Sequence, residues 1–453
     1  MNLFEISEEI ERFNDNLINN NESIVNSIIK ENAFRRDNVY LREVEVPYNL
    51  SKRFLNSDNY NIPDLDTNLT ESPLTTDLCN KMFKPFNLEK NRSKGKVAFI
   101  LPSNGLVNIF ARSVLPTYLV GNEILLRFPE RNISTSNIFK KNYLKHFKNI
   151  SISNLASKEF IKNCLNDSSI HTIVIYGSNT WIREYWNLFI FSGKKIIFEG
   201  PGNDSVIVSE NSDIDLAAQS TLRGILNNDG QSCIATKRVY VNSNVADTYF
   251  EKLTNLVKKI EFAHPEESNC SSSVGPILSD KIKNTIRSQH NDAMGFYNHG
   301  DFKPAKIIYN TETKEDSFHG KHVLYYKPSI YLCHPQMKMV VNETFYPVIP
   351  VVKYDSEEEL VEFMNYSNLG INCNVFGNLK DSTHKKLWKM NRLVFKNTLA
   401  TDIENQNFSF RIDGGRKESS YILKTEQNSF LKIDGPRLME LETINQENSF
   451  GKC

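Results

Sequence analysis

The stretch KVAFILP, residues 96–102, is a short apolar run, and its repetition along the chain decides the fold. Three runs of the same kind follow: NEILLRF at 122–128, HTIVIYG at 171–177 and KKIIFEG at 194–200. The segments between them, such as NIFARSVLPTYLV (108–120), SNIFKKNYLKHF (136–147) and TWIREYWNLFIFS (180–192), have apolar residues at helical spacing. Strands that alternate with helices form βαβ units around a mainly parallel sheet. The sequence therefore predicts an α/β fold whose ligands bind at the carboxyl ends of the strands.

A second block of helices and strands begins after Gly200. The segment SDIDLAAQSTLRGIL (212–226) is predicted to be a helix, with Ser212 and Asp215 as its capping signal. Further strands are predicted in RVYVN (238–242), HVLYYKPSIYL (322–332), VIPVVKY (348–354) and CNVFG (373–377). Because 453 residues are many for a single core, we expect two or three domains.

The N-terminal part is predicted to begin with two helices. Ile6, Ile10, Phe13 and Leu17 lie at helical spacing, and a second helix is indicated around Ile24 and Ile28. Several glutamates flank the first apolar stripe, so we expect that helix to pack on the protein itself rather than on a membrane. From Val39 to Glu89 the chain is rich in Asn, Asp, Pro and Ser, and offers only short strand candidates such as VYLREVEV (39–46). This segment is predicted to be an irregular surface cover without a function of its own.

Charge and cysteine usage restrict the partners and the compartment. Lys+Arg and Asp+Glu both number 54, without long blocks of one sign, so nucleic acid and anionic membrane surfaces are not supported as partners. The seven cysteines form no CxxC pair and no metal-ligand spacing, which favours reduced thiols in the cytoplasm and no metal site. The acidic start MNLFEISEEIERF does not resemble a signal peptide, and no apolar run approaches the ~20 residues that a membrane span needs. We therefore expect a cytoplasmic protein that acts on a small molecule.

Three side chains at predicted loops or strand ends are candidates for chemistry. Cys233 follows a glycine turn in GQSC (230–233), where a thiol is accessible to substrate, although an isolated cysteine is more often inert. Glu199 closes the strand 194–200, either as a working carboxylate or as an ordinary solvated one. Asn104 in ILPSNG (100–105) closes another strand, where an amide can stabilise an oxyanion or cap the following helix.

Together these stretches resemble the aldehyde dehydrogenase superfamily, over roughly residues 95 to 425. FEGPGN (198–203) is similar to the motif of the family's general base, which implies that role for Glu199. GQSC is similar to its nucleophile motif, and ILPSNG to the segment that supplies its oxyanion-hole amide. The resemblance thus implies Cys233 as the nucleophile and Asn104 as the oxyanion-hole residue.

The same resemblance implies a set of cofactor contacts. In GNEILLRFPE (121–130), Arg127 stands where the family usually has a lysine that contacts the adenosine ribose, and Glu130 matches the acidic residue that binds ribose hydroxyls. Because a carboxylate repels a 2′-phosphate, NAD is favoured over NADP. Gly177 and Ser178 match the turn at the pyrophosphate, with Ile182 in place of the turn's last glycine. ETFYPVIPVV (343–352) implies that Glu343 contacts the nicotinamide ribose and Phe345 the nicotinamide.

The implied architecture is α/β, with a Rossmann-like dinucleotide-binding domain and a second α/β catalytic domain. We expect an N-terminal helical and irregular arm (1–93), the dinucleotide-binding domain (94–199), the catalytic domain (200–400), and a C-terminal segment that packs back on the body (401–453). YSNLGINCNVF (366–376) and GGRKES (414–419) resemble segments that close the site and mark the C-terminal region of the family. Whether the chain forms a homo-oligomer stays open.

The leading function is oxidation of an aldehyde to a carboxylate with NAD, through a thioester on Cys233. An acyl-thioester (acyl-CoA) reductase or acylating aldehyde dehydrogenase would use the same cysteine with a thiol acceptor or donor, and GPGN (200–203) and PSNG (102–105) resemble such branches as well. Glu199 favours hydrolysis, because the acylating branch commonly lacks an acid there. A non-catalytic member of the superfamily is the third alternative, and retention of Cys233, Glu199, Asn104 and Glu343 together weighs against it.

Overall fold

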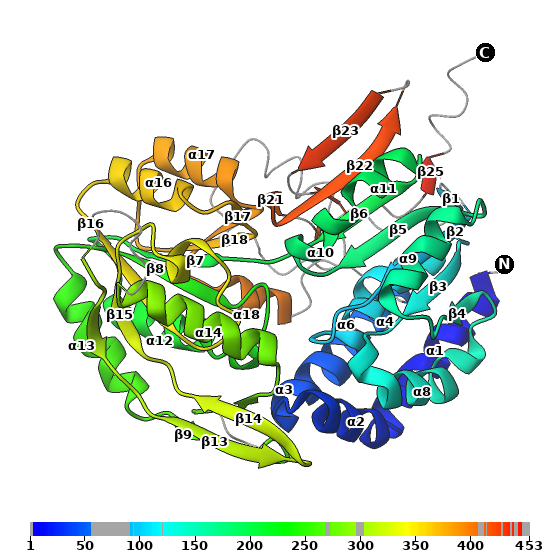
Figure 1. Cartoon of the computed structure of the whole chain (residues 1–453), viewed down its shortest axis with the longest axis horizontal. Coiled ribbons are helices and arrows are strands. Elements are labelled where there is room, and N and C mark those ends of the chain that lie inside the picture. The colour runs from blue at the N-terminus through cyan, green and yellow to red at the C-terminus, as the bar shows by residue number, and fades with distance from the viewer. Residues whose placement is uncertain are drawn as a thin grey trace.

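Two seven-stranded sheets organise the chain in the computed structural model (Figure 1). The structure describes residues 3–55, 91–93, 95–119, 121–267, 272–295, 303–405, 412–413, 415–426, 429–434, 437–438 and 443–445. Each sheet is mainly parallel and is covered by helices, so the predicted α/β fold with a Rossmann-like part and a second α/β part is confirmed.

The first sheet has the strand order β23-β22-β6-β5-β2-β3-β4. Its strands are β2 (Lys96–Ile100), β3 (Glu123–Arg127), β4 (Ile150–Ile152), β5 (Ile170–Tyr176), β6 (Lys195–Glu199), β22 (Ser420–Glu426) and β23 (Ser429–Asp434). All four runs predicted as strands are therefore present. β2 to β6 are parallel, whereas β22 and β23 form an antiparallel hairpin on the edge of β6. The chain proceeds outward from β2 in both directions, which places a topological switch point between β2 and β5.

Helices connect the strands of this sheet as predicted. They are α6 (Leu106–Ile109) and α7 (Leu115–Leu119) with a π-helical turn between them (Phe110–Val114), α8 (Ile133–Asn142), α9 (Ser157–Asn166), α10 (Asn179–Glu184) and α11 (Trp186–Phe191). Short 3-10 turns lie at Glu130–Asn132 and Leu144–His146. The strands carry nearly continuous apolar runs because both faces of the sheet are buried.

The second sheet has the order β12-β15-β16-β8-β7-β18-β19. Its strands are β7 (Asp204–Val208), β8 (Thr236–Asn242), β12 (Lys306–Tyr309), β15 (Ile330–Leu332), β16 (Ile349–Tyr354), β18 (Asn372–Phe376) and β19 (Leu393–Lys396). Only β12, at one edge, is antiparallel. The helices are α12 (Ile214–Ile225), α13 (Ala246–Val257), α14 (Asp280–Ala293), α15 (Lys338–Val341), α16 (Glu357–Asn365), α17 (Asp381–Met390) and α18 (Ala400–Asn405).

Smaller strand pairings complete the described structure. They are β13 (Thr313–Phe318) and β11 (Pro276–Ile277) on β14 (Lys321–Tyr326), β9 (Glu261–Phe262) with β10 (Ser273–Val274), β17 (Leu369–Gly370) with β21 (Arg416–Lys417), β1 (Asn91–Ser93) with β25 (Thr443–Asn445), and β20 (Ile412–Asp413) with β24 (Arg437–Leu438). The predicted cap of the 212–226 helix was wrong by one residue, because the side chain of Asp213, not Ser212, accepts the hydrogen bond from the Leu216 backbone N–H.

The N-terminal region forms α1 (Leu3–Asn19), α2 (Glu22–Asn32), α3 (Arg36–Tyr40), a π-helical turn (Leu41–Glu45) and α4 (Val46–Leu55). The two predicted helices are confirmed, and Phe13 is buried with its ring 5.3 Å from that of Phe110. The strand candidate VYLREVEV was wrong, because residues 39–46 are helical and their valines pack into the first core. The rest of the expected cover, from residue 56 to 90, lies outside the described residues.

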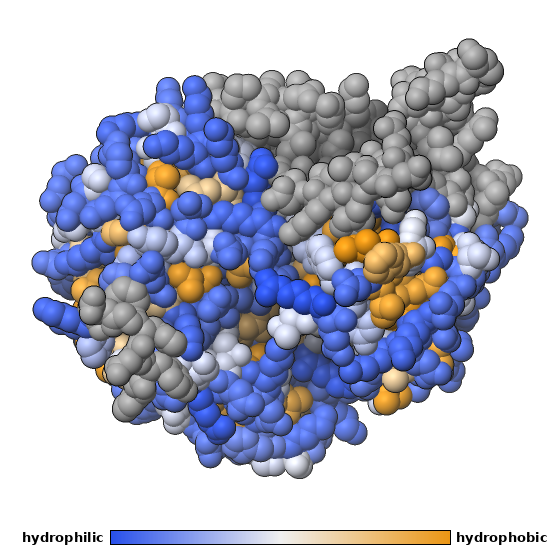
Figure 2. Space-filling model, turned by 45° about the horizontal axis from the view of Figure 1, so that its top comes forward, coloured by the Kyte–Doolittle hydropathy of each residue, from blue (hydrophilic) through white to orange (hydrophobic). Residues whose placement is uncertain are grey.

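A short linker joins the two sheets. β6 ends at Glu199, and only residues 200–203 separate it from β7 in the second sheet. The carboxyl edge of the first sheet therefore faces the amino ends of β7 and β8. Figure 2 shows a largely hydrophilic face with apolar residues in separate patches. Within the described ranges, no helix is both long and apolar enough to cross a bilayer.

Candidate active site

Cys233 lies in the loop between α12 and β8 and is half-buried. The other described cysteines, Cys164, Cys333 and Cys373, are buried, and burial raises the pKa of each thiol. Cys79, Cys270 and Cys453 lie outside the described residues. Cys233 is therefore the most accessible of the described thiols, as a nucleophile requires.

The turn before Cys233 has an unusual backbone. Asn228, Asp229 and Gly230 have φ values of 49°, 53° and 74°, so three consecutive residues lie in the left-handed region. At Gly230 a side chain would also collide with the Tyr346 backbone. Two independent features require glycine at this position: its positive φ angle and the close approach of the Tyr346 backbone. The turn is thereby fixed against the segment that contains Phe345.

Asn104 reaches the cysteine loop from the carboxyl end of β2. Its Nδ2 donates a hydrogen bond to the backbone oxygen of Gln231, at 3.1 Å. A side-chain amide has two N–H groups, so this bond orients the amide and leaves a second donor for a developing oxyanion. The structure thus brings together two residues that the sequence analysis selected from distant segments.

The linker after Glu199 packs directly on Cys233. A Cβ atom at Gly202 would overlap the carbonyl oxygen of Cys233, which explains the need for glycine there. The Gly202 backbone N–H donates to Glu343 Oε1 at 3.0 Å. Glu199 is half-buried at the end of β6. The three segments carrying Glu199, Cys233 and Glu343 therefore converge at one place.

Glu343 and Phe345 are joined to the cysteine loop by Lys237, which the sequence analysis did not select. Lys237 Nζ donates to the backbone oxygen of Gly230 and lies 5.1 Å from the centre of the Phe345 ring. Burial lowers the pKa of the Lys237 ammonium to about 8, with the Glu343 carboxylate opposing that change. Burial likewise raises the pKa of Glu343. Lys237 lies one residue before the predicted strand 238–242, and the structure extends that strand to Thr236 and buries the lysine.

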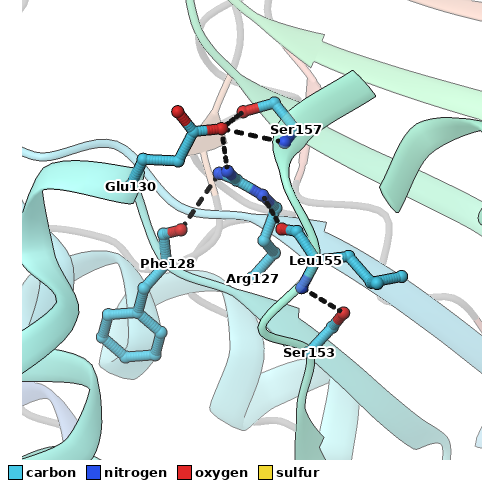
Figure 3. Close-up of polar contacts among 6 residues, drawn as sticks. All are labelled: Arg127, Phe128, Glu130, Ser153, Leu155 and Ser157. Carbon is cyan, nitrogen blue, oxygen red and sulfur yellow. Dashed lines mark hydrogen bonds and ion pairs between the residues drawn. The ribbon is translucent and has the colours of Figure 1, made fainter. Parts of the chain in front are cut away.

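Arg127 and Glu130 form a closed network at the carboxyl end of β3 (Figure 3). The buried Arg127 guanidinium donates to the backbone oxygens of Leu155 (3.2 Å) and Phe128 (3.0 Å), and to Glu130 Oε1 (2.9 Å). Glu130 Oε1 also accepts from the Ser157 backbone N–H (3.0 Å) and hydroxyl (3.2 Å), and these bonds lower the pKa of Glu130. Arg127 thus braces the strand end, while the other carboxylate oxygen of Glu130 takes no part in this network.

The remaining cofactor candidates lie at or near the switch point. Gly177 follows β5, and its backbone N–H donates to the Glu199 backbone oxygen at 3.0 Å. Ser178 immediately precedes α10, and Ile182, within α10, is fully buried. β17 pairs with β21, which joins the predicted segment 366–376 to 414–419, although Gly414 itself lies outside the described residues.

The fold and the site together define a two-sheet α/β protein with a cysteine-centred site between the carboxyl end of β6 and the amino ends of β7 and β8. Residues 76–430 match the model of the aldehyde dehydrogenase family. The chain therefore belongs to the aldehyde dehydrogenase family.

Individual relatives show the breadth of this similarity. A lactaldehyde dehydrogenase from Methanococcus aeolicus is 26% identical over 346 residues, which cover 73% of this chain and 68% of that protein. An NADP-dependent glyceraldehyde-3-phosphate dehydrogenase from Streptococcus equinus is 24% identical, over 65% of this chain and 59% of its own length. The crystal structure of an NAD-dependent aldehyde dehydrogenase from Sinorhizobium meliloti has a TM-score of 0.72 at 16% identity, over 97% of this chain and 83% of that one. At that identity the likeness shows the fold alone.

Proposed function

We propose that this chain oxidises an aldehyde to a carboxylate with NAD, through a thioester on Cys233. The observation that carries the proposal is the convergence of Asn104, Cys233 and the Glu199–Gly202 linker, held by the Asn104–Gln231 hydrogen bond. Three segments from different parts of the chain meet there, and each presents the residue type that this chemistry needs.

Each residue then has a defined task. The Cys233 thiolate adds to the aldehyde carbon, and the resulting oxyanion accepts hydrogen bonds from the Asn104 amide and the Cys233 backbone N–H. Nicotinamide dinucleotide, when bound, supplies the acceptor for the hydride that leaves this carbon. Glu199 takes a proton from the water that attacks the resulting thioester, which releases the carboxylic acid and restores the Cys233 thiol.

The residues present are suited to a dinucleotide. The switch point between β2 and β5 is where such sheets bind nucleotides, and Gly177 lies beside it without a side chain. NAD is proposed over NADP because Arg127 is buried and donates to Leu155, Phe128 and Glu130, so a 2′-phosphate would meet the exposed Glu130 carboxylate.

The proposal is tested by NADH formation with a panel of aldehydes, with and without coenzyme A. We expect turnover without coenzyme A, and a loss of about 10³-fold or more in Cys233→Ala with dinucleotide binding retained. Cys164→Ala removes a buried thiol in α9, beside the first sheet, and is the matched control that should keep its activity. Turnover that requires coenzyme A would replace hydrolysis with acyl transfer, and near-normal turnover of Cys233→Ala would exclude the cysteine mechanism.

A further inference from the structure

A single arginine from the N-terminal region contacts both loops of the active site. Arg42 lies in the π-helical turn between α3 and α4. One guanidinium nitrogen donates to the backbone oxygen of Asn104 at 2.9 Å, and the other donates to Asn227 Oδ1 at 3.2 Å and to Ser232 Oγ at 3.5 Å. The planar, rigid guanidinium therefore spans the gap between the Asn104 loop and the Cys233 loop.

Glu43, the residue after Arg42, holds the segment that follows Asn104. Glu43 is buried, and its carboxylate accepts hydrogen bonds from the backbone N–H groups of Val107 (2.6 Å) and Asn108 (3.1 Å). The Asn108 side chain returns a hydrogen bond to the Arg42 backbone oxygen at 3.2 Å. These hydrogen bonds therefore hold the π-helical turn against the segment after Asn104.

Arg35, which precedes α3, anchors the turn before the nucleophile. Its Nε donates to Asp229 Oδ1 at 3.1 Å, and both side chains are buried. Asn38 also donates to Asp229, at 3.3 Å, and so does the Gly275 backbone N–H, at 3.0 Å. Left-handed backbone at a non-glycine residue costs about 1 kcal/mol or more, so these contacts stabilise a strained turn. The N-terminal region thereby fixes both sides of the site.

We propose that Arg42 is a positioning residue, which sets the separation between the Asn104 amide and the Cys233 backbone N–H. This inference rests on the proposed function, because it assigns those two donors to an oxyanion. The Arg42 guanidinium donates to Asn104, Asn227 and Ser232, so it acts on these donors through the loops that carry them. Its removal should leave the thiol reactive but misplace the donors, and a misplacement of about 1 Å can lower a rate by about 10²-fold.

Two reactions of Cys233 separate these effects without knowledge of the natural aldehyde. In acylation by p-nitrophenyl acetate, the thiolate adds to the ester carbonyl, a tetrahedral oxyanion forms, and p-nitrophenolate leaves. In alkylation by iodoacetamide, the thiolate displaces iodide and no oxyanion forms. Only the first reaction needs the donors that Arg42 holds.

The test measures both reactions on the full chain for the wild type and four variants. These are Arg42→Met, Arg42→Lys, Asn104→Ala and the double variant that combines Arg42→Met with Asn104→Ala. Arg42→Met should slow acylation by about 10- to 10²-fold, and its alkylation rate at the high-pH plateau should stay within about twofold of wild type. Because both residues serve one donor set, the double variant should acylate no more slowly than Asn104→Ala alone. Arg36→Met is the matched control, because Arg36 contacts Glu22 and Asn26 and should leave both rates unchanged.

Distinct outcomes overturn the inference. Additive losses in the double variant, or equal losses of acylation and alkylation, would show a general structural effect of Arg42. If Arg42→Met does not fold, Arg42→Lys decides the question by the same pair of rates. If Asn104→Ala or Cys233→Ala acylates at the wild-type rate, the proposed function itself fails. A wild-type acylation rate in Arg42→Met alone would overturn only the role of Arg42.

Discussion

The Arg127–Glu130 network predicts how this protein discriminates between NAD and NADP. Glu130 is about two-thirds exposed, whereas Arg127 is 4% exposed and has its donors directed to Leu155, Phe128 and Glu130 itself. A 2′-phosphate at the end of β3 would therefore meet a carboxylate rather than an available guanidinium. Replacing Glu130 with Gln removes the charge and keeps an oxygen that can accept from Ser157 and Arg127.

The size of the effect follows from the exposure. Two unit charges about 4 Å apart interact by about 1 kcal/mol in water, and the exposed Glu130 is close to that limit. The 2′-phosphate carries nearly two charges, so removing the Glu130 charge should make its binding free energy more favourable by about 1–2 kcal/mol. This corresponds to a rise of about 5- to 30-fold in the NADP:NAD ratio of kcat/KM. Arg127→Met should move the ratio in the opposite direction, because it leaves the Glu130 charge uncompensated.

The assay is initial-rate kinetics with both cofactors and one aldehyde, at two salt concentrations. The change caused by Glu130→Gln should shrink as ionic strength rises. Glu123→Gln is the matched control, because Glu123 is an exposed carboxylate at the opposite end of β3, paired with Lys96. An unchanged ratio in Glu130→Gln would show that the 2′ position lies away from this network, and the argument from Glu130 would be lost.

Two further predictions concern the catalytic loops. Glu199→Gln should give a burst of NADH close to one per active site and then a steady phase slowed by about 10²–10⁴-fold, measured by stopped flow, and normal cycling would remove Glu199 as the base. Because burial holds the pKa of Lys237 at about 8 instead of 10.5, the unfolded chain binds more protons between those values, so the free energy of unfolding should rise with pH across that window by up to about 3 kcal/mol. Lys237→Met should lack this rise in urea unfolding from pH 7.5 to 10.5, and parallel curves for the two proteins would show that the ammonium titrates normally.

Much of the fold could be predicted because its signals are local. Each buried parallel strand is a continuous apolar run, as in residues 96–102, and the proposed site residues Asn104 and Glu199 lie at or just after strand ends that the pattern itself marks. The strand predicted at 39–46 failed for a local reason too. Alternating valines and charges suit a strand, but here Val39 and Val44 pack into the core from a helical segment, while Glu43 is buried against backbone N–H groups.

What could not be predicted is how distant polar residues pair. Arg42 lies 62 residues from Asn104 and 190 from Ser232, and Arg35 lies 194 from Asp229. In the sequence an arginine on a helical segment is indistinguishable from a solvated one, since nothing local specifies that its guanidinium will meet a carbonyl oxygen or a carboxylate.

The left-handed turn shows why such long-range contacts belong with the active site. Asn228 and Asp229 would relax to ordinary backbone angles if local preference alone acted on them, and Cys233 would then move with them. The contacts that oppose this relaxation come from Arg35 and Asn38 in the N-terminal region and from Gly275, all far from the turn in the sequence. These contacts therefore tie the position of the Cys233 loop to the packing of the N-terminal region. Arg42 adds a contact from the segment that the sequence analysis regarded as a surface cover, and its guanidinium links the Asn104 backbone oxygen to Ser232, beside Cys233.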